Sequence, residues 1–235
     1  MAIDYTKRPQ SNPTPQAPSP AAPPAAPAAP PAPSSVDLSK ISLTKSSPTV
    51  SLAKAGASGG TIRINLNWAQ GSGAGGGFFK RKSGVDLDLR CLYELSDGSL
   101  GGVGALDRNF GSLEKRPFIK LDQDDRSGSA ASGENMFVNL ADPGVFRRIL
   151  VFADIYEGSP NWAAVDGVVT VESQFGPPIE VRMDSEKNSL RTASIALIES
   201  GPQGVTITRA VEYFSGGDKM DKHFRWGLNW GRGSK

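Results

Sequence analysis

Two groups of carboxylates are the residues of this 235-residue sequence whose types and spacing could carry chemistry. The first is Asp86 and Asp88, which lie two apart in the alternating polar and apolar stretch from Val85 to Leu95. Residues two apart on a strand leave the same face with Cβ atoms only ~7 Å apart, so these like charges repel unless water or a cation compensates them. Taken alone, the pair is typical of a solvated strand face with Arg90 as counterion.

The second group lies between residues 122 and 135. It combines four carboxylates with small polar residues, namely Asp122, Asp124, Asp125, Gly133, Glu134 and Asn135. Ca²⁺ takes about 6–8 oxygen ligands from such groups and from backbone carbonyls. Arg126 stands where a helix-loop-helix calcium loop needs an oxygen and Glu134 falls one place late, so this is not an EF-hand. An acidic loop next to an acidic strand pair predicts a Ca²⁺ site of another kind, with an exposed acidic turn as the alternative.

A further candidate oxygen ligand is Glu157, which ends a strand-like segment at Gly158, with an ordinary charged loop residue as the alternative. Paired carboxylates also serve glycosidases, but that chemistry needs a cleft and acids whose pKa burial has raised, whereas the dense run Asp122–Asp125 is expected to be solvated. The one histidine, His223, has no serine or cysteine motif beside it, which disfavours histidine-dependent catalysis and zinc sites. We predict that the protein is not an enzyme.

The segments that must position these carboxylates are strands. Apolar residues alternate with polar ones along short runs separated by Gly and Pro turn signals, without the alternation of strands and helices that a parallel sheet needs. We predict an all-β, antiparallel β-sandwich with long loops and few short helical turns, one of them near Pro160–Val165. The predicted strands are Thr61–Trp68, Val85–Leu95, Met136–Leu140, Arg148–Tyr156, Val168–Ser173, Ile179–Met183, Ser194–Glu199, Val205–Phe214 and Phe224–Trp230.

The first 40 residues differ in composition from the rest. Eleven of the 18 prolines lie between Pro9 and Pro33, and no charged residue occurs from Pro9 to Val36, so this stretch cannot bury a core. We predict a disordered Pro/Ala-rich leader and linker over residues 1–40 and one β-sandwich domain over residues 41–235. A docking ligand for an aromatic groove is the alternative role of the leader.

Charge and apolar content limit the classes of partner and compartment. The 26 Lys and Arg residues nearly balance 24 Asp and Glu residues, which gives no electrostatic footprint for nucleic acid. No signal peptide or transmembrane segment is visible, and the single cysteine, Cys91, excludes an intrachain disulfide. We therefore predict a cytoplasmic location. Cys91, Trp226 and Trp230 lie at strand spacing and are expected to pack in a core, with a sugar-stacking role of the tryptophans as the alternative.

Six segments in order resemble the TerD-domain family of tellurium-resistance and stress proteins, and its TerA type in particular. The resemblance covers residues 41–230. It is carried by Ile41-Ser-Leu-Thr-Lys45 with Val50-Ser-Leu-Ala-Lys54, Leu66-Asn-Trp68, Gly84-Val-Asp-Leu-Asp-Leu89, Asp124-Asp-Arg-Ser-Gly128 with Gly133-Glu-Asn135, Ile155-Tyr-Glu-Gly158, and Phe224-Arg-Trp-Gly-Leu-Asn-Trp230.

The resemblance implies a calcium-binding β-sandwich without established enzymatic activity, acting with other tellurite-resistance proteins in a membrane-associated stress complex. Asp86 and Asp88 match the family's acidic strand pair, and its acidic loop is matched by Asp124, Asp125, Glu134 and Asn135. The family's longer Gly/Asp/Glu-rich stretch is shortened here to residues 129–132. We predict a Ca²⁺-binding interaction module peripheral to the inner face of the membrane. Two alternatives remain: a calcium-dependent carbohydrate-binding or carboxylate glycosidase sandwich, and calcium-mediated docking on anionic lipid through residues 78–82.

Overall fold

The computed structural model describes residues 40–52, 59–68, 85–122, 133–158, 161–174, 176–185 and 189–231. All of them belong to one compact unit, Asp37–Lys235. The predicted leader up to residue 39, the segment 69–84 with its 78–82 tip, and the predicted ligands Asp124 and Asp125 lie outside the described residues.

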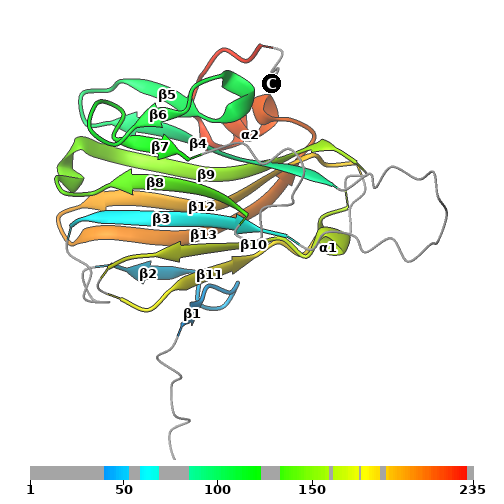
Figure 1. Cartoon of the computed structure of the whole chain (residues 1–235), viewed down its shortest axis with the longest axis horizontal. Coiled ribbons are helices and arrows are strands. Elements are labelled where there is room, and N and C mark those ends of the chain that lie inside the picture. The colour runs from blue at the N-terminus through cyan, green and yellow to red at the C-terminus, as the bar shows by residue number, and fades with distance from the viewer. Residues whose placement is uncertain are drawn as a thin grey trace, which may run out of the picture. The chain divides into compact units, whose positions relative to one another are not determined.

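The described strands form two sheets (Figure 1). In sheet order, the seven-stranded sheet contains β1 (Ile41–Ser42), β11 (Ile179–Arg182), β10 (Val168–Glu172), β3 (Thr61–Asn67), β8 (Glu134–Asn139), β7 (Ile119–Leu121) and β6 (Gly111–Ser112). The six-stranded sheet contains β2 (Thr49–Ser51), β13 (Gly204–Phe214), β12 (Thr192–Gly201), β9 (Phe146–Glu157), β4 (Asp86–Leu95) and β5 (Leu100–Val103). Neighbouring strands are antiparallel except for β1 and β11, so the predicted antiparallel β-sandwich is confirmed.

The core lies between the sheets and follows the period-two pattern of the sequence. Ile62, Ile64 and Leu66 of β3 face it from one sheet, and Leu87 and Leu89 of β4 from the other. Cys91 continues the β4 set at 1% exposure, as predicted, and burial raises the pKa of its thiol to about 12. A thiol buried in this way is a small core residue and not a nucleophile.

Helical structure is short in the described residues: two 3₁₀ turns, η1 (Ala105–Asp107) and η2 (Pro143–Val145), one turn, α1 (Trp162–Val165), and α2 (Gly217–Phe224). The turn α1 was predicted. It is capped by the Asn161 side chain, which accepts a hydrogen bond from the Ala164 amide at 3.0 Å. Neither α-helix, nor any other helix among the described residues, is long and apolar enough to cross a membrane.

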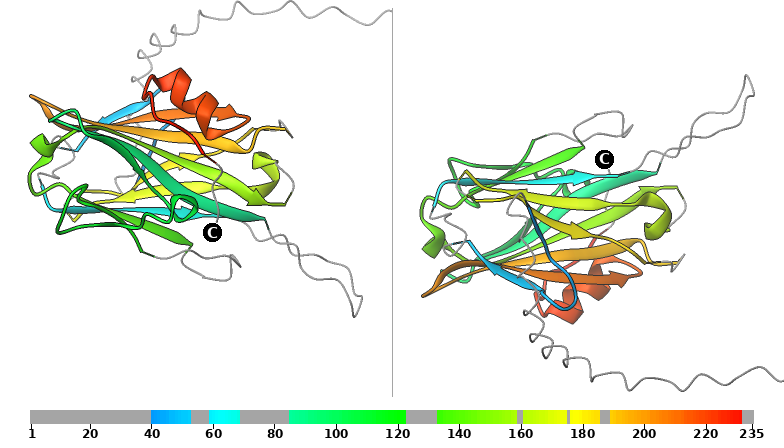
Figure 2. Two further views of the ribbon diagram at one scale, coloured as in Figure 1. Left: turned by 90° about the horizontal axis from the view of Figure 1, so that it is seen from above. Right: turned by 90° about the horizontal axis from the view of Figure 1, so that it is seen from below.

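The predicted strand Phe224–Trp230 is wrong. Phe224 ends α2, and residues 226–231 form neither strand nor helix. Arg225 has a φ of 57° and Gly227 a φ of 81°, both in the left-handed region, which a strand cannot accommodate. Residues 217–231, here called the C-terminal segment, pack on the outer face of the six-stranded sheet (Figure 2).

The C-terminal segment has its own apolar contacts with that face. Trp226, 4% exposed, and Met220 of α2 are buried against Leu92 of β4 and against Leu150 and Phe152 of β9. The alternation of β4 and β9 thus serves two cores, one between the sheets and one beneath this segment. The expectation that Trp226 packs is confirmed.

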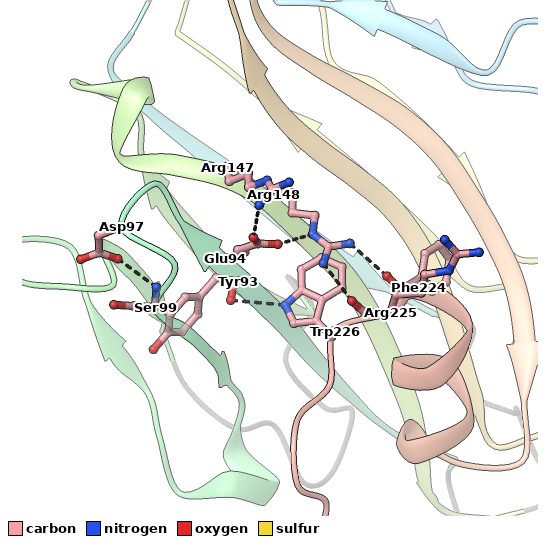
Figure 3. Close-up of polar contacts among 9 residues, drawn as sticks. All are labelled: Tyr93, Glu94, Asp97, Ser99, Arg147, Arg148, Phe224, Arg225 and Trp226. Atoms are coloured by element: carbon pink, nitrogen blue, oxygen red, sulfur yellow. Dashed lines mark hydrogen bonds and ion pairs between the residues drawn. The ribbon is translucent and has the colours of Figure 1, made fainter.

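An arginine holds the same segment by polar contacts (Figure 3). The Arg148 guanidinium lies 3.8 Å from the centroid of the Trp226 ring and donates hydrogen bonds to the carbonyls of Phe224 and Arg225. It also donates to Glu94 at 2.6 Å, and this bond, aided by the charges of Arg148 and Arg147, lowers the pKa of the Glu94 carboxyl.

Candidate functional site

The two predicted strand carboxylates lie at the start of β4 and are buried. Asp86 is 6% exposed and Asp88 only 1%, so they do not form the solvated face that ordinary alternation suggests. In the register of β4 with β9, Asp86 lies opposite Glu157 and Asp88 opposite Asp154. Residues directly opposite on antiparallel strands share a face with Cβ atoms about 4.5–5.5 Å apart, so the register forms two carboxylate pairs, with a β-bulge between them, on the outer face of the six-stranded sheet.

Glu134 approaches this end of β4 from the other sheet. It opens β8 in the inward-facing set with Met136 and Val138, is 1% exposed, and accepts a hydrogen bond from the Leu89 amide at 2.6 Å. The bond forms where no described strand pairs with this side of β4, because β5 pairs with Cys91–Glu94. The structure therefore brings the Glu134 carboxylate beside the Asp88–Leu89 peptide.

The two ends of the acidic segment are fixed near Glu134. The Asp122 amide donates to the Asn135 carbonyl at 2.9 Å, and the Asp122 side chain is exposed. Gly133 has a φ of 63°, and a Cβ there would lie 2.1 Å from the Leu66 carbonyl oxygen, so only glycine fits. Both ends of the predicted acidic loop therefore lie at the end of the sandwich where Glu134 begins β8.

The Asn135 side chain lies elsewhere. Its Oδ1 accepts hydrogen bonds from Arg63 Nε at 2.8 Å and from Asn65 Nδ2 at 2.9 Å, on the outer face of the seven-stranded sheet. Successive residues of a strand point to opposite faces, so Glu134 and Asn135 cannot both reach one site with their side chains. The described structure gives Asn135 a structural role in a polar ladder on that outer face.

Sequence reasoning missed an ion-pair network beside the carboxylates. Arg90, with a side chain 7% exposed, donates to Asp154 at 2.7 Å and to Asp107 at 2.6 Å. Burial alone lowers the pKa of the Arg90 guanidinium, but the charges and hydrogen bonds of the two aspartates outweigh it and the pKa is raised. One sequence signal was available: Asp154 stands between two core residues of β9 and must therefore face outward.

No group of three or more His, Cys, Asp or Glu side chains arranged to hold a metal ion occurs within the described ranges. Two of the predicted ligands, Asp124 and Asp125, are outside those ranges.

Comparison with known proteins places the chain in a family. A scan against protein-family models gives no match. The tellurium resistance protein TerA of Alcaligenes sp. is 43% identical over 203 residues, which are 85% of this chain and 60% of that protein. The chain is a relative of the TerA-type tellurium resistance proteins. The predicted resemblance is thereby confirmed, over a chain that spans about 60% of the length of this relative.

Two solved structures resemble this TerA relative. One is a protein of unknown function, with a TM-score of 0.49 and 13% identity over 73% of this chain and 99% of the other. The second is a homologue of the telluride resistance protein TerD from Streptomyces coelicolor A3(2), with a TM-score of 0.47 and 16% identity over 70% and 95% of the two chains.

In this TerA relative, a groove of about 680 Å³ lies between η1 and the C-terminal segment on the outer face of the six-stranded sheet. Two arginines and two aspartates balance its charge, and the lining includes Arg90, Asp107, Asp154, Tyr156, Arg191 and Trp230. The Trp230 ring is half-buried, lying edge-on to Phe152 and 5.5 Å from the Arg90 guanidinium carbon. Trp230 is partly buried against the cluster that contains Trp226 and also lines the groove, so the predicted core packing holds for Trp226 and only in part for Trp230.

The one histidine lies on the surface of α2. The His223 side chain is 48% exposed, and its Nε2 lies 3.2 Å from a carboxylate oxygen of Glu212. Its ring also contacts Phe214 and Phe224. These contacts give His223 a place in the packing of α2 on β13.

Proposed function

We propose that this TerA relative is a calcium-binding interaction module of a tellurium resistance system and has no enzymatic activity. One observation carries the proposal: Asp86, Asp88 and Glu134 are buried at the end of the sandwich where both ends of the acidic segment are fixed. Gathering carboxylates away from water costs free energy, which a divalent cation with oxygen ligands offsets.

In this proposal the strand carboxylates and Glu134 form the fixed half of the site. Asp86 and Asp88 lie on the outer face of β4, with Glu157 opposite Asp86, and Glu134 reaches the edge of β4 from the facing sheet, where its carboxylate accepts from the Leu89 amide. Asp122, Asp124 and Asp125 supply the other half from the acidic segment, whose backbone Gly133 allows to turn. An ion bound between the halves would link the segment to β4.

The partner-binding role follows from that link. A bound cation stabilises the conformation that holds it, because binding to one state alone shifts the population towards that state. The surface formed by the ordered acidic segment would then bind another protein of the resistance system. Binding of the partner would therefore be calcium-dependent and reciprocal, each ligand raising affinity for the other.

The test is isothermal calorimetry of Ca²⁺ into the chelator-stripped full chain, with the thermal midpoint recorded in Ca²⁺ and in chelator. We expect a binding event and a rise in the midpoint. An ion at about 100 times its dissociation constant stabilises the native state by about 2.7 kcal/mol. The double variant D86N/D88N should lose both signals, whereas the exposed control D166N should keep them, because Asp166 lies in a left-handed turn that asparagine also adopts. Retained Ca²⁺ affinity in D86N/D88N would remove these residues from the site.

A carbohydrate-acting sandwich is the second candidate, and the groove beside Asp154 and Trp230 is the feature that favours it. The burial of Trp226 and the arginine pairing of Asp154 count against a stacking platform and a proton donor. A glycan array with a generic glycosidase assay separates the two, since the calcium module should give no signal in either.

A further inference from the structure

An arginine occupies a core-facing position on β13. Val205 and Ile207 of the same strand are buried in the core, and Val211 and Tyr213 pack against it, so alternation places Arg209 in the inward-facing set. Its side chain is 10% exposed. Its aliphatic stem is buried, and its guanidinium nitrogens remain accessible at the side of the sandwich, because none of them is among the buried polar atoms that lack a hydrogen-bond partner.

The described residues compensate Arg209 only weakly. The nearest carboxylate oxygen, Asp184 Oδ1, lies 3.9 Å from its Nη2, beyond hydrogen-bond distance. Across the described ranges the Arg209 side chain makes no hydrogen bond and no second ion pair. A guanidinium carries five N–H donors, so nearly all of its donor capacity remains for a ligand.

These donors border a cavity of about 430 Å³ at the side of the sandwich, where the chain crosses from β1 to β2. Its lining is Ser42, Leu43, Thr44, Lys45, Ser46, Glu180, Arg182, Asp184 and Arg209. None of these residues belongs to the carboxylate group at the start of β4. The cavity is therefore a second candidate binding site, lined by polar residues and separate from the carboxylates of β4.

The crossing supplies a further donor. Thr44 Oγ1 and Ser46 Oγ lie 3.0 Å apart and share one hydrogen bond, and Thr44 Oγ1 also accepts from the Ser47 amide at 3.1 Å. Whichever hydroxyl donates in the shared bond, the proton of the other has no acceptor among the described residues. One O–H at the cavity is thus available to a ligand.

The charge of the lining favours an anion. Lys45 and Arg182 join Arg209 as cations, and both are exposed. Of the two lining carboxylates, Glu180 is paired with Lys40 at 2.9 Å, outside the cavity. Arg182 is likewise paired outside the cavity, 3.5 Å from Asp166, so Lys45 and Arg209 are the cations left facing Asp184, whose side chain is 64% exposed.

We propose that this cavity binds a small tetrahedral oxyanion of the phosphate or sulfate class, with Arg209 as its anchor. The planar guanidinium binds two oxygens of such an anion at once, while Lys45 and the hydroxyl pair approach from the crossing between β1 and β2, and Arg182 approaches from β11. This role explains an arginine at a position where the alternation of β13 calls for an apolar residue.

The test titrates the full chain with inorganic phosphate and, separately, with sulfate, by isothermal calorimetry at low ionic strength up to about 10 mM. We expect saturable binding of at least one anion. R209Q should weaken it at least about tenfold, because a hydrogen bond to a charged group is lost. R147Q is the matched control: it removes the same charge from a 72% exposed arginine outside the cavity and should leave the affinity unchanged.

Three results would overturn the proposal: no saturable heat with either anion, equal affinity in R209Q and the wild type, or equal weakening by R147Q, which would indicate only general charge attraction. If R209Q does not fold, the exposed pair K45Q/R182Q decides. Weakening of about fivefold or more supports the site, and an unchanged affinity contradicts it.

Discussion

Replacing Trp226 by alanine tests how the C-terminal segment is held. The side chain is 4% exposed, packs with Leu92, Leu150, Phe152 and Met220, and lies beneath the Arg148 guanidinium at 3.8 Å. Truncation of a buried aromatic residue costs about 3–5 kcal/mol, and this range includes about 0.5–1 kcal/mol for a partly exposed cation–π contact. We expect W226A to lower the free energy of unfolding by about 3–5 kcal/mol.

The assay is urea unfolding followed by circular dichroism, together with amide hydrogen exchange. W226F is the matched control: it keeps an aromatic ring over the same face and loses the hydrogen bond from the indole to the Tyr93 carbonyl, which is long at 3.3 Å. It should cost about 1 kcal/mol. In W226A, exchange should rise first at the amides of Gly227 and Leu228, which donate to the Asp221 carboxylate. A loss below about 1 kcal/mol with unchanged exchange in residues 217–231 would refute the second core.

Three further predictions follow from single residues. G133A should destabilise the fold by more than about 2 kcal/mol, because an added Cβ meets the Leu66 carbonyl and a φ of 63° is strained for alanine. If the calcium proposal holds, it should also weaken Ca²⁺ binding. Equilibrium unfolding and calorimetry measure the two effects, and wild-type stability would contradict the first. The Cys91 thiol, with its pKa raised to about 12, should react with an aromatic disulfide reagent only after denaturation; rapid labelling of the native protein at pH 7 would count against its burial. Because the folded-state pKa of Glu94 is lowered, the ionised carboxylate contributes stability at pH values above its ordinary pKa of 4.5, and this contribution is lost as pH falls through the folded-state pKa. Below about pH 4.5, E94Q should therefore lose less stability than the wild type when the free energy of unfolding is measured against pH. Parallel pH dependences of the two proteins would contradict the Arg148 contact.

The strands that border the core between the two sheets could be predicted, because one face of each strand is buried in that core. Ile62, Ile64 and Leu66 alternate with polar residues, and the same period recurs in β10, β11 and β13. The failure at Phe224–Trp230 has the same origin. Aromatic residues two apart also occur in an irregular segment that packs on an outer face. The left-handed backbone conformations of Arg225 and Gly227 rule out a strand, and the spacing of apolar residues does not reveal them.

The sequence predicted part of the candidate site: which acidic residues come near one another, but not every direction in which their side chains point. Proximity of Glu134 to the Asp88–Leu89 peptide depends on which strands face each other across the sandwich, and the acidic residues alone suggested it. The direction of the Asn135 side chain follows from the alternation of β8 alone, because Glu134 and Asn135 are successive residues of that strand. Within the Arg90 network, the pairing with Asp107 could not be predicted, because Asp107 lies in a 3₁₀ turn whose position follows from the tertiary fold.

Two arginines of the six-stranded sheet are largely buried, Arg90 on its outer face and Arg209 on its inner face. The C-terminal segment covers one face, so Arg90 of β4 lies out of water and must be neutralised by Asp107 and Asp154. Arg209 points between the sheets, yet no carboxylate of the described residues lies within hydrogen-bond distance of it. The same residue type is thus fully paired where the fold needs a structural ion pair and left with free donors where it borders a cavity. That contrast, within one chain and one sheet, is the reason to look for an anion at Arg209 and not at Arg90.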